Sequence, residues 1–417
     1  MAYINVSTAA QRWGITVRRV QELCQNGTIK GAERFGRAWM IPENTQKPHD
    51  KRTKTARWLQ DNKMEGFMEK NPRRNPFLIH TDLYSSAGTA QRVVDSFAEY
   101  PKMAELIRLQ FDVRRGRIDS VLKGIEPFLK ENTGFYLSIS LGVTLSFCAI
   151  WKGDINLWET ARQLIYNAPF RNENELEEIR FWIAVIESNI HDVRSYPDWF
   201  TRGDFECLPA DSYSTARVFY AKKLFIVAEE HAVGKTNIDN LEKMTLMKTI
   251  PYVLEPMISQ AKIEKTLLPE IYLRFMAALT YKNLGENEAA IHHIDKGIDL
   301  CLPDRLYGVI AECRAPLGNL LDDRLILADK EAYMRVKALS KSYGIGWIKL
   351  HNALMDRHIS DTLTERERDT ARFAAMGLSN AEIAKRLNLE ISSVKQYIFS
   401  SMNKCGAKKR SELGMYV

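Results

Sequence analysis

Apolar residues recur at helical spacing through most of the chain. From about Phe77 to Leu354 the pattern predicts one helix after another, and the alternation typical of strands is hard to find. The two prolines of Asn71-Pro-Arg-Arg-Asn-Pro76 discourage helix on either side and mark the start of this region. The pattern therefore predicts a mainly α fold, with a long helical region over residues 77–355.

One part of this region has a specific packing pattern. Tyr272 to Leu300 contains Ala278-x-x-Tyr281-x-x-Leu284-Gly285 and then Ala289. The glycine lets the chain turn, and the alanines let two helices approach closely. This arrangement resembles a tetratricopeptide helical hairpin. A weaker echo runs from Phe147 to Ile165, with Gly153-Asp154 at its turn.

The resemblance implies that residues 77–355 form a tetratricopeptide-like helical-repeat array. Such an array has a concave surface suited to a peptide, a partner protein or a small molecule. Six aromatic residues are candidates for lining that surface, although core packing is the commoner role for each: Tyr136, Trp151, Trp158, Trp182, Tyr220 and Tyr281.

The end of the chain predicts short helices with well-defined starts. Thr364 with Glu367, and Ser379 with Glu382, have the spacing of capping boxes, in which the hydroxyl caps the N3 amide and the glutamate reaches the N-cap amide. Gly377 stands where a left-handed residue ends a helix. These signals predict two helices separated by a tight turn.

The helical pattern continues beyond these signals. Ile383, Ala384 and Leu387 form one apolar stripe, and the next helix runs from near Ile391 to about Lys404. The positions of this last helix that should face the core are Val394, Ile398, Met402 and Cys405. The positions that should face outward are Lys395, Gln396 and Phe399, with Ser392 and Asn403 flanking them.

This combination closely resembles the LuxR-type DNA-binding domain. The matching runs are Leu363-Thr-Glu-Arg-Glu367, Gly377-Leu-Ser-Asn-Ala-Glu-Ile-Ala384, Val394-Lys395 and Lys404-Cys-Gly-Ala-Lys-Lys-Arg410. The resemblance implies a four-helix LuxR-type helix-turn-helix over residues 361–417. The chain departs from the family at Glu390, where a capping Ser, Thr or Asn is usual, and at Tyr397, where His is usual.

In the LuxR-type family, the recognition helix reads base edges from the positions that Lys395, Gln396 and Phe399 occupy here. Lysine suits guanine O6 and N7, glutamine suits adenine N6 and N7, and an aromatic ring can cover a thymine methyl. Ser393 and Lys404 match positions that hold phosphates in the family. The implied DNA contacts are Ser392, Ser393, Lys395, Gln396, Phe399 and Lys404.

The first 57 residues predict two helices followed by two strands. Ser7 should cap a helix that runs through Trp13, and Thr16 should cap a second that runs through Gln25 and ends at Asn26-Gly27. The expected strands are Ile29 to Ala32 and Ala38 to Ile41, around Arg34-Phe-Gly-Arg37. In the second helix, the residues expected to face inward are Val17, Val20, Leu23 and Cys24.

This order of elements resembles the winged helix-turn-helix of MerR-like and excisionase-like proteins. In such proteins the second helix enters the major groove and the wing lies on the DNA backbone. The resemblance implies a DNA-binding domain over residues 1–57, followed by a basic linker over residues 58–76. A small winged domain used for protein contacts is the alternative. The implied DNA contacts are Arg18, Arg19, Gln21, Arg34 and Arg37.

Charge is distributed in a way that fits DNA binding at both ends. Residues 1–57 carry 11 Lys and Arg against 4 Asp and Glu, and residues 361–417 carry 10 against 7. Residues 58–360 carry 38 against 41, so the excess of positive charge lies entirely at the ends. Phosphate attracts exactly such basic segments, whereas the slightly acidic middle region is not expected to contact DNA.

Composition restricts the class of protein further. The chain is 45% hydrophobic and 10% aromatic, as folded globular proteins are. Its six cysteines are scattered without the paired spacing of a zinc site and are expected to be reduced. No apolar run approaches the roughly 18 residues of a membrane span, and the N-terminus lacks the apolar core of a signal peptide. We expect a cytoplasmic, nucleoid-associated protein without a membrane partner.

Two local motifs suggest a nucleotide-binding site and a metal site, but their residue spacing fits neither. A P-loop needs a glycine five positions before Gly234-Lys-Thr236, and that position is Glu229. His292 and His293 are adjacent, so they point about 100° apart on a helix and cannot chelate one metal ion. No catalytic constellation has supporting motif context. We therefore expect no enzyme activity, no cofactor and no metal.

Taken together, these patterns favour a sequence-specific DNA-binding transcriptional regulator. The helical region would sense a ligand or partner and control the DNA-binding ends. Expected partners are double-stranded DNA, a peptide, small molecule or protein in the helical groove, and a second copy in a homodimer. Two alternatives stay open: an architectural DNA-bridging protein, and a helical-repeat interaction scaffold with vestigial DNA-binding heads, against which the basic ends argue.

Overall fold

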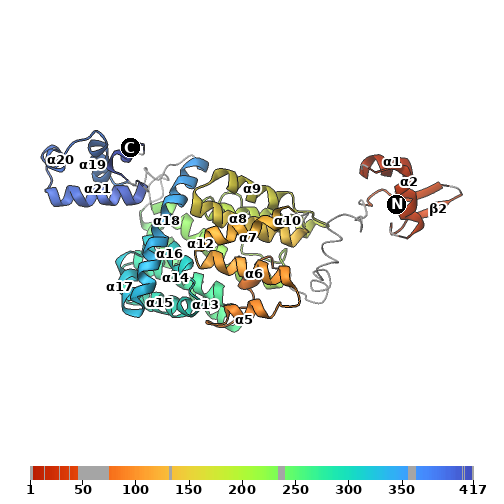
Figure 1. Ribbon diagram of the computed structural model, residues 1–417, viewed down its shortest axis with the longest axis horizontal. Helices are drawn as coiled ribbons and strands as arrows, with labels where there is room; N and C mark the ends of the chain where they lie inside the picture. The colour runs from red at the N-terminus through yellow and green to blue at the C-terminus, as the bar shows by residue number, and fades with distance from the viewer. Residues whose placement is uncertain are drawn as a thin grey trace. The chain divides into compact units, whose positions relative to one another are not determined.

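The computed structural model divides the chain into two compact units, residues 1–61 and 62–417. The second unit contains a helical body and a C-terminal region with a hydrophobic core of its own. Figure 1 labels the elements of each part. The residues that the structure describes are 3–13, 15–27, 29–36, 38–45, 75–130, 134–232, 240–355, 363–405, 407 and 409–415.

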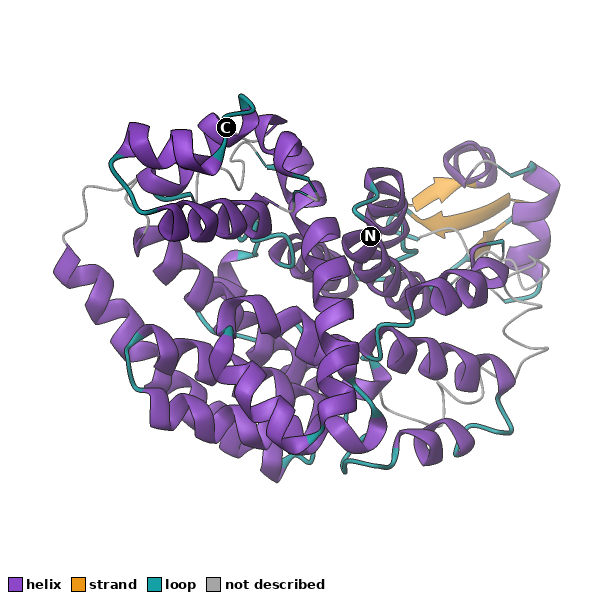
Figure 2. Cartoon of the chain, turned by 60° about the vertical axis from the view of Figure 1, so that its left-hand side comes forward, coloured by secondary structure: helices purple, strands orange, loops and turns teal. Residues whose placement is uncertain are grey.

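The N-terminal unit combines two helices with a small sheet, which Figure 2 shows in orange. Its elements are β1 (Tyr3–Asn5), α1 (Val6–Trp13), α2 (Val17–Gln25), β2 (Glu33–Phe35) and β3 (Ala38–Pro42). The strand order is β1-β3-β2, and both pairings are antiparallel. Trp13, Val20, Leu23 and Ile41 are among the buried residues that join the helices to the sheet.

Several local expectations for this unit are confirmed, and others are wrong. The Thr16 side chain accepts the Arg19 amide and caps α2, as expected. The cap of α1 is Asn5 rather than Ser7, because the Thr8 amide donates to Asn5 Oδ1 at 2.8 Å and the helix already begins at Val6. Val17 is 42% exposed instead of facing inward.

The sheet also differs from its prediction. The first strand of the hairpin begins at Glu33, after a turn that contains Gly31, and not at Ile29. Ile29 is instead a buried core residue. The strand β1 was not predicted, because three residues are too few to show an alternating pattern.

The described part of the helical body includes Asn75, two residues before the predicted start. Asn75 is buried, and its side chain donates to Thr215 Oγ1 at 3.1 Å, so this residue belongs to the body rather than to a linker. The α-helices of the body are α5 (Ala90–Asp95), α6 (Pro101–Arg114), α7 (Ile118–Leu129), α8 (Phe135–Lys152), α9 (Ile155–Tyr166), α10 (Glu173–Ser188), α11 (Asp198–Thr201), α12 (Tyr213–Ala232), α13 (Asn240–Ile263), α14 (Leu267–Asn283), α15 (Asn287–Cys301), α16 (Tyr307–Leu317), α17 (Asn319–Ala328) and α18 (Lys330–Leu354). Its short 3-10 helices are η1 (Leu78–His80), η2 (Ala210–Ser212) and η3 (Leu302–Asp304).

Both segments with the small-residue pattern form antiparallel helical hairpins. The strongest pattern corresponds to α14 and α15, which turn at Gly285 with φ +80°. Within this hairpin a Cβ at Gly297 would lie 2.8 Å from the Phe275 ring, so a larger residue there would push the two helices apart. The weaker echo corresponds to α8 and α9, where the Asp154 side chain caps α9.

The helical body closes on itself. In an open solenoid each repeat contacts only its neighbours. Here α18 packs against α16 and α17 and also against α8, nearly two hundred residues earlier in the chain. The approach is close, because a Cβ at Gly346 of α18 would lie 2.5 Å from the Trp151 carbonyl oxygen of α8. Contacts between helices far apart in the sequence are thus added to the neighbour contacts of a repeat array.

The helix α8 occupies the centre of this arrangement. It is long and apolar enough to cross a membrane, with a mean hydropathy of 1.4, but 89% of its residues are buried inside the body. Some of its polar groups form hydrogen bonds there: the Thr144 hydroxyl donates to the Ser140 carbonyl, and Gln110 of α6 donates to Ser140 Oγ at 2.9 Å. Core packing accounts for its apolar composition.

The C-terminal region consists of α19 (Glu365–Ala375), α20 (Asn380–Leu387), α21 (Ile391–Cys405) and the 3-10 helix η5 (Arg410–Met415). Both predicted capping boxes are present, and Gly377 has φ +84°, as expected. The fourth helix is a 3-10 helix and not an α-helix. Apolar residues of all four elements form the core: Leu363, Ala371, Ala374, Ile383, Ala384, Val394, Ile398, Cys405 and Leu413.

Candidate DNA-binding surface

A three-residue turn joins α20 to α21. Asn388 adopts the left-handed conformation with φ +52° and ends α20, and the Leu389 amide then donates to the Ala384 carbonyl at 2.9 Å. Glu390 contributes its carbonyl to the first turn of α21 through the Val394 amide. The left-handed conformation of Asn388 was not predicted, although Asn is the residue that tolerates this conformation best after Gly. The result is a helix-turn-helix.

The helix α21 has one buried and one exposed face. Val394, Ile398 and Cys405 are buried, and Met402 is half-buried, close to the predicted pattern. On the other face, the structure brings together four of the predicted DNA contacts in a continuous exposed strip, because they are spaced three or four residues apart. We call this the α21 strip, and it consists of Ser392, Lys395, Gln396 and Phe399.

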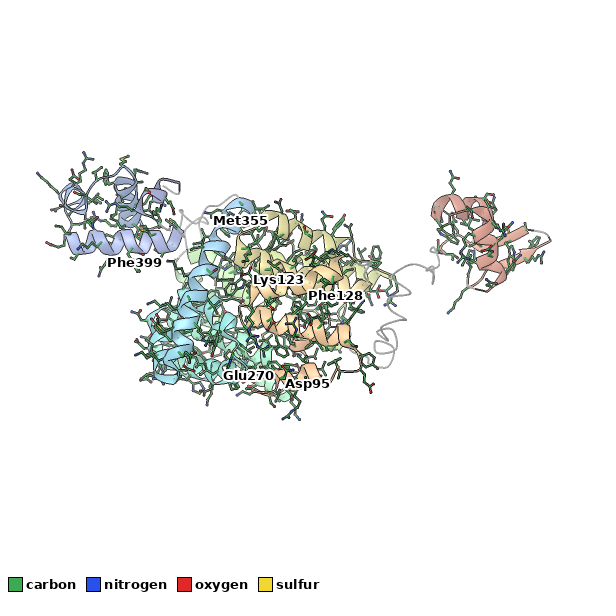
Figure 3. The ribbon with its side chains drawn as sticks, in the orientation of Figure 1. Asp95, Lys123, Phe128, Glu270, Met355 and Phe399 are labelled. Atoms are coloured by element: carbon green, nitrogen blue, oxygen red, sulfur yellow. The ribbon has the colours of Figure 1, made fainter. Side chains whose placement is uncertain are left out.

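Phe399 is the most unusual member of the α21 strip. Its side chain is 67% exposed, and Figure 3 labels it on α21. An exposed phenylalanine is common enough by itself. Here it stands between lysine and glutamine side chains that can donate hydrogen bonds, so the strip offers an apolar contact beside two polar ones. Ser393, at the edge of the strip, is half-buried.

The predicted contacts of the N-terminal unit are only partly available. Arg18 is 90% exposed, with Glu22 3.6 Å away, and Gln21 is also exposed on α2. Arg19 is only 24% exposed and donates to Glu22 Oε2 at 3.0 Å, which directs it along the helix surface. Arg34 is exposed on β2, and Arg37 lies outside the described residues.

An exposed aromatic residue lies at the tip of the hairpin between β2 and β3. Phe35 is 80% exposed, next to Gly36 with φ +62°. Arg34 and Arg37 on either side of it were predicted to contact DNA, whereas Phe35 was not among the predicted contacts. Its position in a short polar run was the signal that could have identified it, because nothing in that run predicts a partner for the ring.

Comparison with known protein families decides what the C-terminal region is. Residues 361–417 match the family model described as bacterial regulatory proteins, luxR family. The C-terminal region is a LuxR-family domain. No curated protein and no solved structure gave a match to the chain. The α21 strip therefore lies on the second helix of a helix-turn-helix within a family of bacterial regulators, which supports DNA as a partner and transcriptional regulation as the role.

Lys404 has a different environment from the rest of the predicted contacts in the LuxR-family domain. Its Nζ donates to Glu367 Oε2 at 2.6 Å and so ties α21 to α19. Glu367 also accepts from the Ser400 hydroxyl and from the Thr364 amide. Burial acts to raise the pKa of Glu367, but hydrogen bonds from Lys404, Ser400 and Thr364 outweigh it and lower that pKa to about 2. Lys404 therefore links α21 to α19 in this structure, and with a side chain that is still 38% exposed its contact with phosphate stays a prediction.

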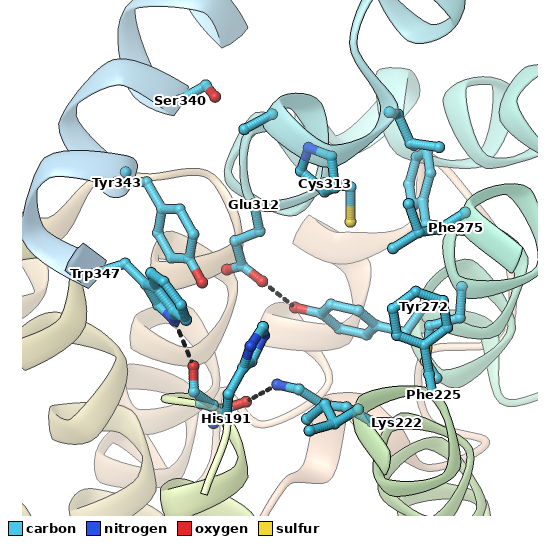
Figure 4. Close-up of a pocket in the computed structure, with 18 of the residues that line it drawn as sticks. His191, Lys222, Phe225, Tyr272, Phe275, Glu312, Cys313, Ser340, Tyr343 and Trp347 are labelled. Carbon is cyan, nitrogen blue, oxygen red and sulfur yellow. Dashed lines mark hydrogen bonds between the residues drawn. The ribbon is translucent and has the colours of Figure 1, made fainter. Parts of the chain in front are cut away.

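The helical body contains a cavity of about 410 Å³. Figure 4 shows side chains from α12, α14, α16 and α18 converging on it. The six aromatic residues proposed from the sequence do not line it, and Trp151, Trp158 and Trp182 are instead buried in the core. The aromatic residues that do line it include Phe225, Tyr272, Phe275, Tyr343 and Trp347, which come from separate helices and share no local sequence pattern.

Two other sequence signals can be placed. His293 contacts Glu255 at 2.9 Å and stacks on Tyr281 with ring centroids 5.5 Å apart, so it packs within the body. Gly234 to Thr236 lies outside the described residues. Within the described ranges, no group of three His, Cys, Asp or Glu residues is placed to hold a metal ion.

Proposed function

We propose that the protein is a sequence-specific transcriptional regulator in which the LuxR-family domain reads DNA through the α21 strip. The observation that carries this proposal is the exposure of Lys395, Gln396 and Phe399 on one face of the second helix of the helix-turn-helix. Lysine can bind guanine O6 and N7, glutamine can bind adenine N6 and N7, and the phenylalanine can cover a thymine methyl. Each good base contact discriminates by about 1–3 kcal/mol.

A second DNA-binding head at the N-terminus is part of the same proposal. Two helices followed by a hairpin are the elements of a winged helix-turn-helix such as that of MerR-like and excisionase-like proteins. Arg18 and Gln21 would face the major groove, and Arg34 and Phe35 would place the hairpin on the DNA backbone. One small head binds weakly alone, and a second tethered head increases affinity through its effective concentration.

The helical body is proposed to be the sensor, and its hairpins relate it to tetratricopeptide-like domains. Support comes from the cavity, which is large enough for a metabolite. Further support comes from α18, which contributes Tyr343 and Trp347 to the cavity and is the last helix before the LuxR-family domain in the sequence. We further propose that the protein acts on cytoplasmic DNA and that ligand binding changes promoter occupancy, with a homodimer as one arrangement on a palindromic site.

The first prediction follows from the α21 strip. Purified full-length protein should select a defined motif from sheared genomic DNA, read out by sequencing the retained fragments. The double variant Lys395→Ala/Gln396→Ala should lose the motif while keeping weak, salt-sensitive DNA retention, because base contacts specify and phosphate contacts only position. The control Lys341→Ala removes an exposed positive charge from α18 and should leave the motif unchanged.

The remaining results of this selection separate the alternatives. Loss of the motif in Arg18→Ala/Gln21→Ala would show that the N-terminal head contributes to reading. Uniform retention of all fragments, fading with salt in every variant, would contradict the proposal and favour an architectural DNA-bridging protein. No retention by any variant would favour an interaction scaffold with vestigial heads.

A further inference from the structure

The cavity of the helical body contains buried polar atoms that lack partners. Among the described residues, Arg114 Nε and Nη1, Asn189 Nδ2 and Glu312 Oε1 are buried without a hydrogen bond. Leaving such groups unsatisfied costs about 1–3 kcal/mol each, and more where the group is charged. Donors outnumber acceptors among these atoms. A bound molecule that formed hydrogen bonds with them would therefore mainly supply acceptors.

Arg114 is the central group of this set. It is only 2% exposed, and its guanidinium carbon lies 3.9 Å from the centroid of the Phe147 ring and 5.5 Å from that of Tyr272. Its Nη1 is 3.9 Å from Glu312 Oε1, which is too long for a hydrogen bond. The Tyr272 hydroxyl donates to the other oxygen of Glu312 at 3.4 Å (Figure 4). The guanidinium is therefore positioned by aromatic rings, and its ion pair with Glu312 includes no hydrogen bond.

Lys222 brings a second cation to the cavity from α12. Its Nζ donates to Asn189 Oδ1 at 2.6 Å, and the Asn189 carbonyl accepts from Trp347 Nε1 at 2.7 Å, as Figure 4 shows. Burial lowers the pKa of Lys222 to about 8, so at neutral pH the ammonium is still the major form. The Asn189 side chain is thereby fixed, and its Nδ2 group faces no protein acceptor.

The other titratable groups of the cavity do not offset these two cations fully. Glu312 is the one carboxylate among the described residues that line it. Burial, together with Lys222 and His351 nearby, lowers the pKa of His191 to about 3, and burial beside Arg114 also lowers that of His80, so both rings are neutral. Lys404 also lines the cavity, but its ammonium is paired with Glu367. Arg114 and Lys222 against Glu312 then leave a positive excess that a singly charged anion would balance.

The rest of the lining is apolar and aromatic. Phe225 and Ile226 come from α12, Phe275 and Met276 from α14, and Ile348 from α18. A volume of about 410 Å³ is at the lower end of the roughly 300–1,000 Å³ typical of small-molecule sites. The cavity thus has room for a metabolite with one ring or a short branched chain, and it is too small for a peptide helix.

We propose that this cavity binds a small organic carboxylate with an aromatic or aliphatic body, and that this compound is the effector of the regulator. The carboxylate accepts from Arg114, Lys222 and Asn189 Nδ2, and the body packs against Phe225 and Phe275. A hydroxyl or amino substituent donates to Glu312 Oε1. The role as effector rests on the proposed function, whereas the binding of the carboxylate does not.

The test measures binding of matched probes to the full-length protein by calorimetry and thermal shift. The probes are hydroxyphenylpropionate and indole acetate, each beside its primary amide, at concentrations up to the millimolar range. The carboxylates should bind saturably, and the amides should bind at least about tenfold more weakly, since they cannot form charge-assisted hydrogen bonds. Amides that bind as tightly as their acids would overturn the proposal.

Two variants locate the site and a third serves as control. Lys222→Met should weaken carboxylate binding by at least about tenfold. Lys223→Met makes the same change at the neighbouring position, which does not line the cavity, and should bind as the parent does. Glu312→Gln removes the nearby negative charge but keeps an amide oxygen that can accept from the ligand substituent, so it should bind the carboxylates at least as tightly. Unchanged affinity in Lys222→Met, or weaker binding in Glu312→Gln than in Lys223→Met, would overturn the assignment.

DNA selection by the same preparations distinguishes a failure of the carboxylate proposal from a failure of the proposed function in DNA binding. A preparation that selects a motif but binds no carboxylate at millimolar concentration would overturn the effector chemistry and leave the regulator intact. A preparation that binds carboxylates through Lys222 but selects no DNA would overturn the regulator and leave the binding site intact.

Discussion

Glu367 joins two helices of the LuxR-family domain, α19 and α21, through one side chain. It completes the capping box of α19 and also accepts from Ser400 and Lys404 of α21. Glu382 forms the same kind of box on α20 without such long-range partners among the bonds seen here. Glu367→Ala should therefore lower the free energy of unfolding of the domain by about 2–3 kcal/mol, and Glu382→Ala by about 1 kcal/mol. Hydrogen exchange at the α19 and α21 amides of the full chain measures both, and equal losses would contradict the argument.

Because the pKa of Glu367 is lowered, its contribution to the free energy of unfolding depends on pH. The folded state holds the carboxylate ionised down to a pKa of about 2, whereas its ordinary value is 4.5. A carboxylate whose pKa is lower in the folded state stabilises the fold at pH values above its ordinary pKa. This stabilisation is lost as the pH falls toward the pKa of the folded state. Protection from exchange at α19, relative to the unfolded chain at the same pH, should thus fall between pH 4.5 and pH 2 by more in the parent than in Glu367→Ala.

Lys222 should make carboxylate binding in the cavity sensitive to alkaline pH. Its pKa is about 8, so the affinity for hydroxyphenylpropionate should fall as pH rises through that value and the ammonium loses its proton. Of the titratable groups that face it, His191 is already neutral, and burial keeps the Cys313 thiol protonated. Glu312 has a raised pKa and would act in the same direction, which makes Glu312→Gln the necessary control. Calorimetry across this range checks the prediction, and a pH-independent affinity in Glu312→Gln would contradict the role of Lys222.

At the scale of elements, the sequence predicts whatever is decided by residues close together in the chain. The capping boxes at Thr364 and Ser379, the cap at Thr16 and the turn at Gly285 each depend on hydrogen bonds or backbone conformation within a few residues. The exposed and buried faces of α21 follow from helical periodicity in the same way. These features carry most of the candidate DNA-binding surface.

Elements whose partners are distant in sequence could not be predicted. Lys404 is held by Glu367, 37 residues earlier, and only the packing of α19 against α21 brings the two together. The strand β1 exists because it pairs with β3, and its three residues have no strand pattern of their own. The cavity is built from at least four helices, so no local motif could show that Arg114, Lys222 and Glu312 face the same space.

At the scale of the whole helical body, closure depends on the contact between α18 and α8. Gly346→Ala should destabilise the body by about 1–3 kcal/mol, because the added methyl group overlaps the α8 backbone at Trp151. Gly344→Ala is the matched control on the same helix, since its Cβ would meet nothing within 4 Å and alanine favours helix. Scanning calorimetry of the full chain, with hydrogen exchange at α8, measures the difference. Equal stability of the two variants would contradict a closed body.

The closure by α18 also has a consequence for synthesis on the ribosome. The apolar helix α8 is complete by Lys152, but the helix that covers it ends only at Leu354, near the end of the body. At roughly 5–20 residues per second, about 10–40 s separate the emergence of the two helices. Throughout that interval one flank of α8 is exposed to solvent, so the nascent chain is expected to bind chaperones that recognise exposed apolar helices. Messages truncated before α18 would yield chains that never bury this surface and are expected to be degraded or to aggregate.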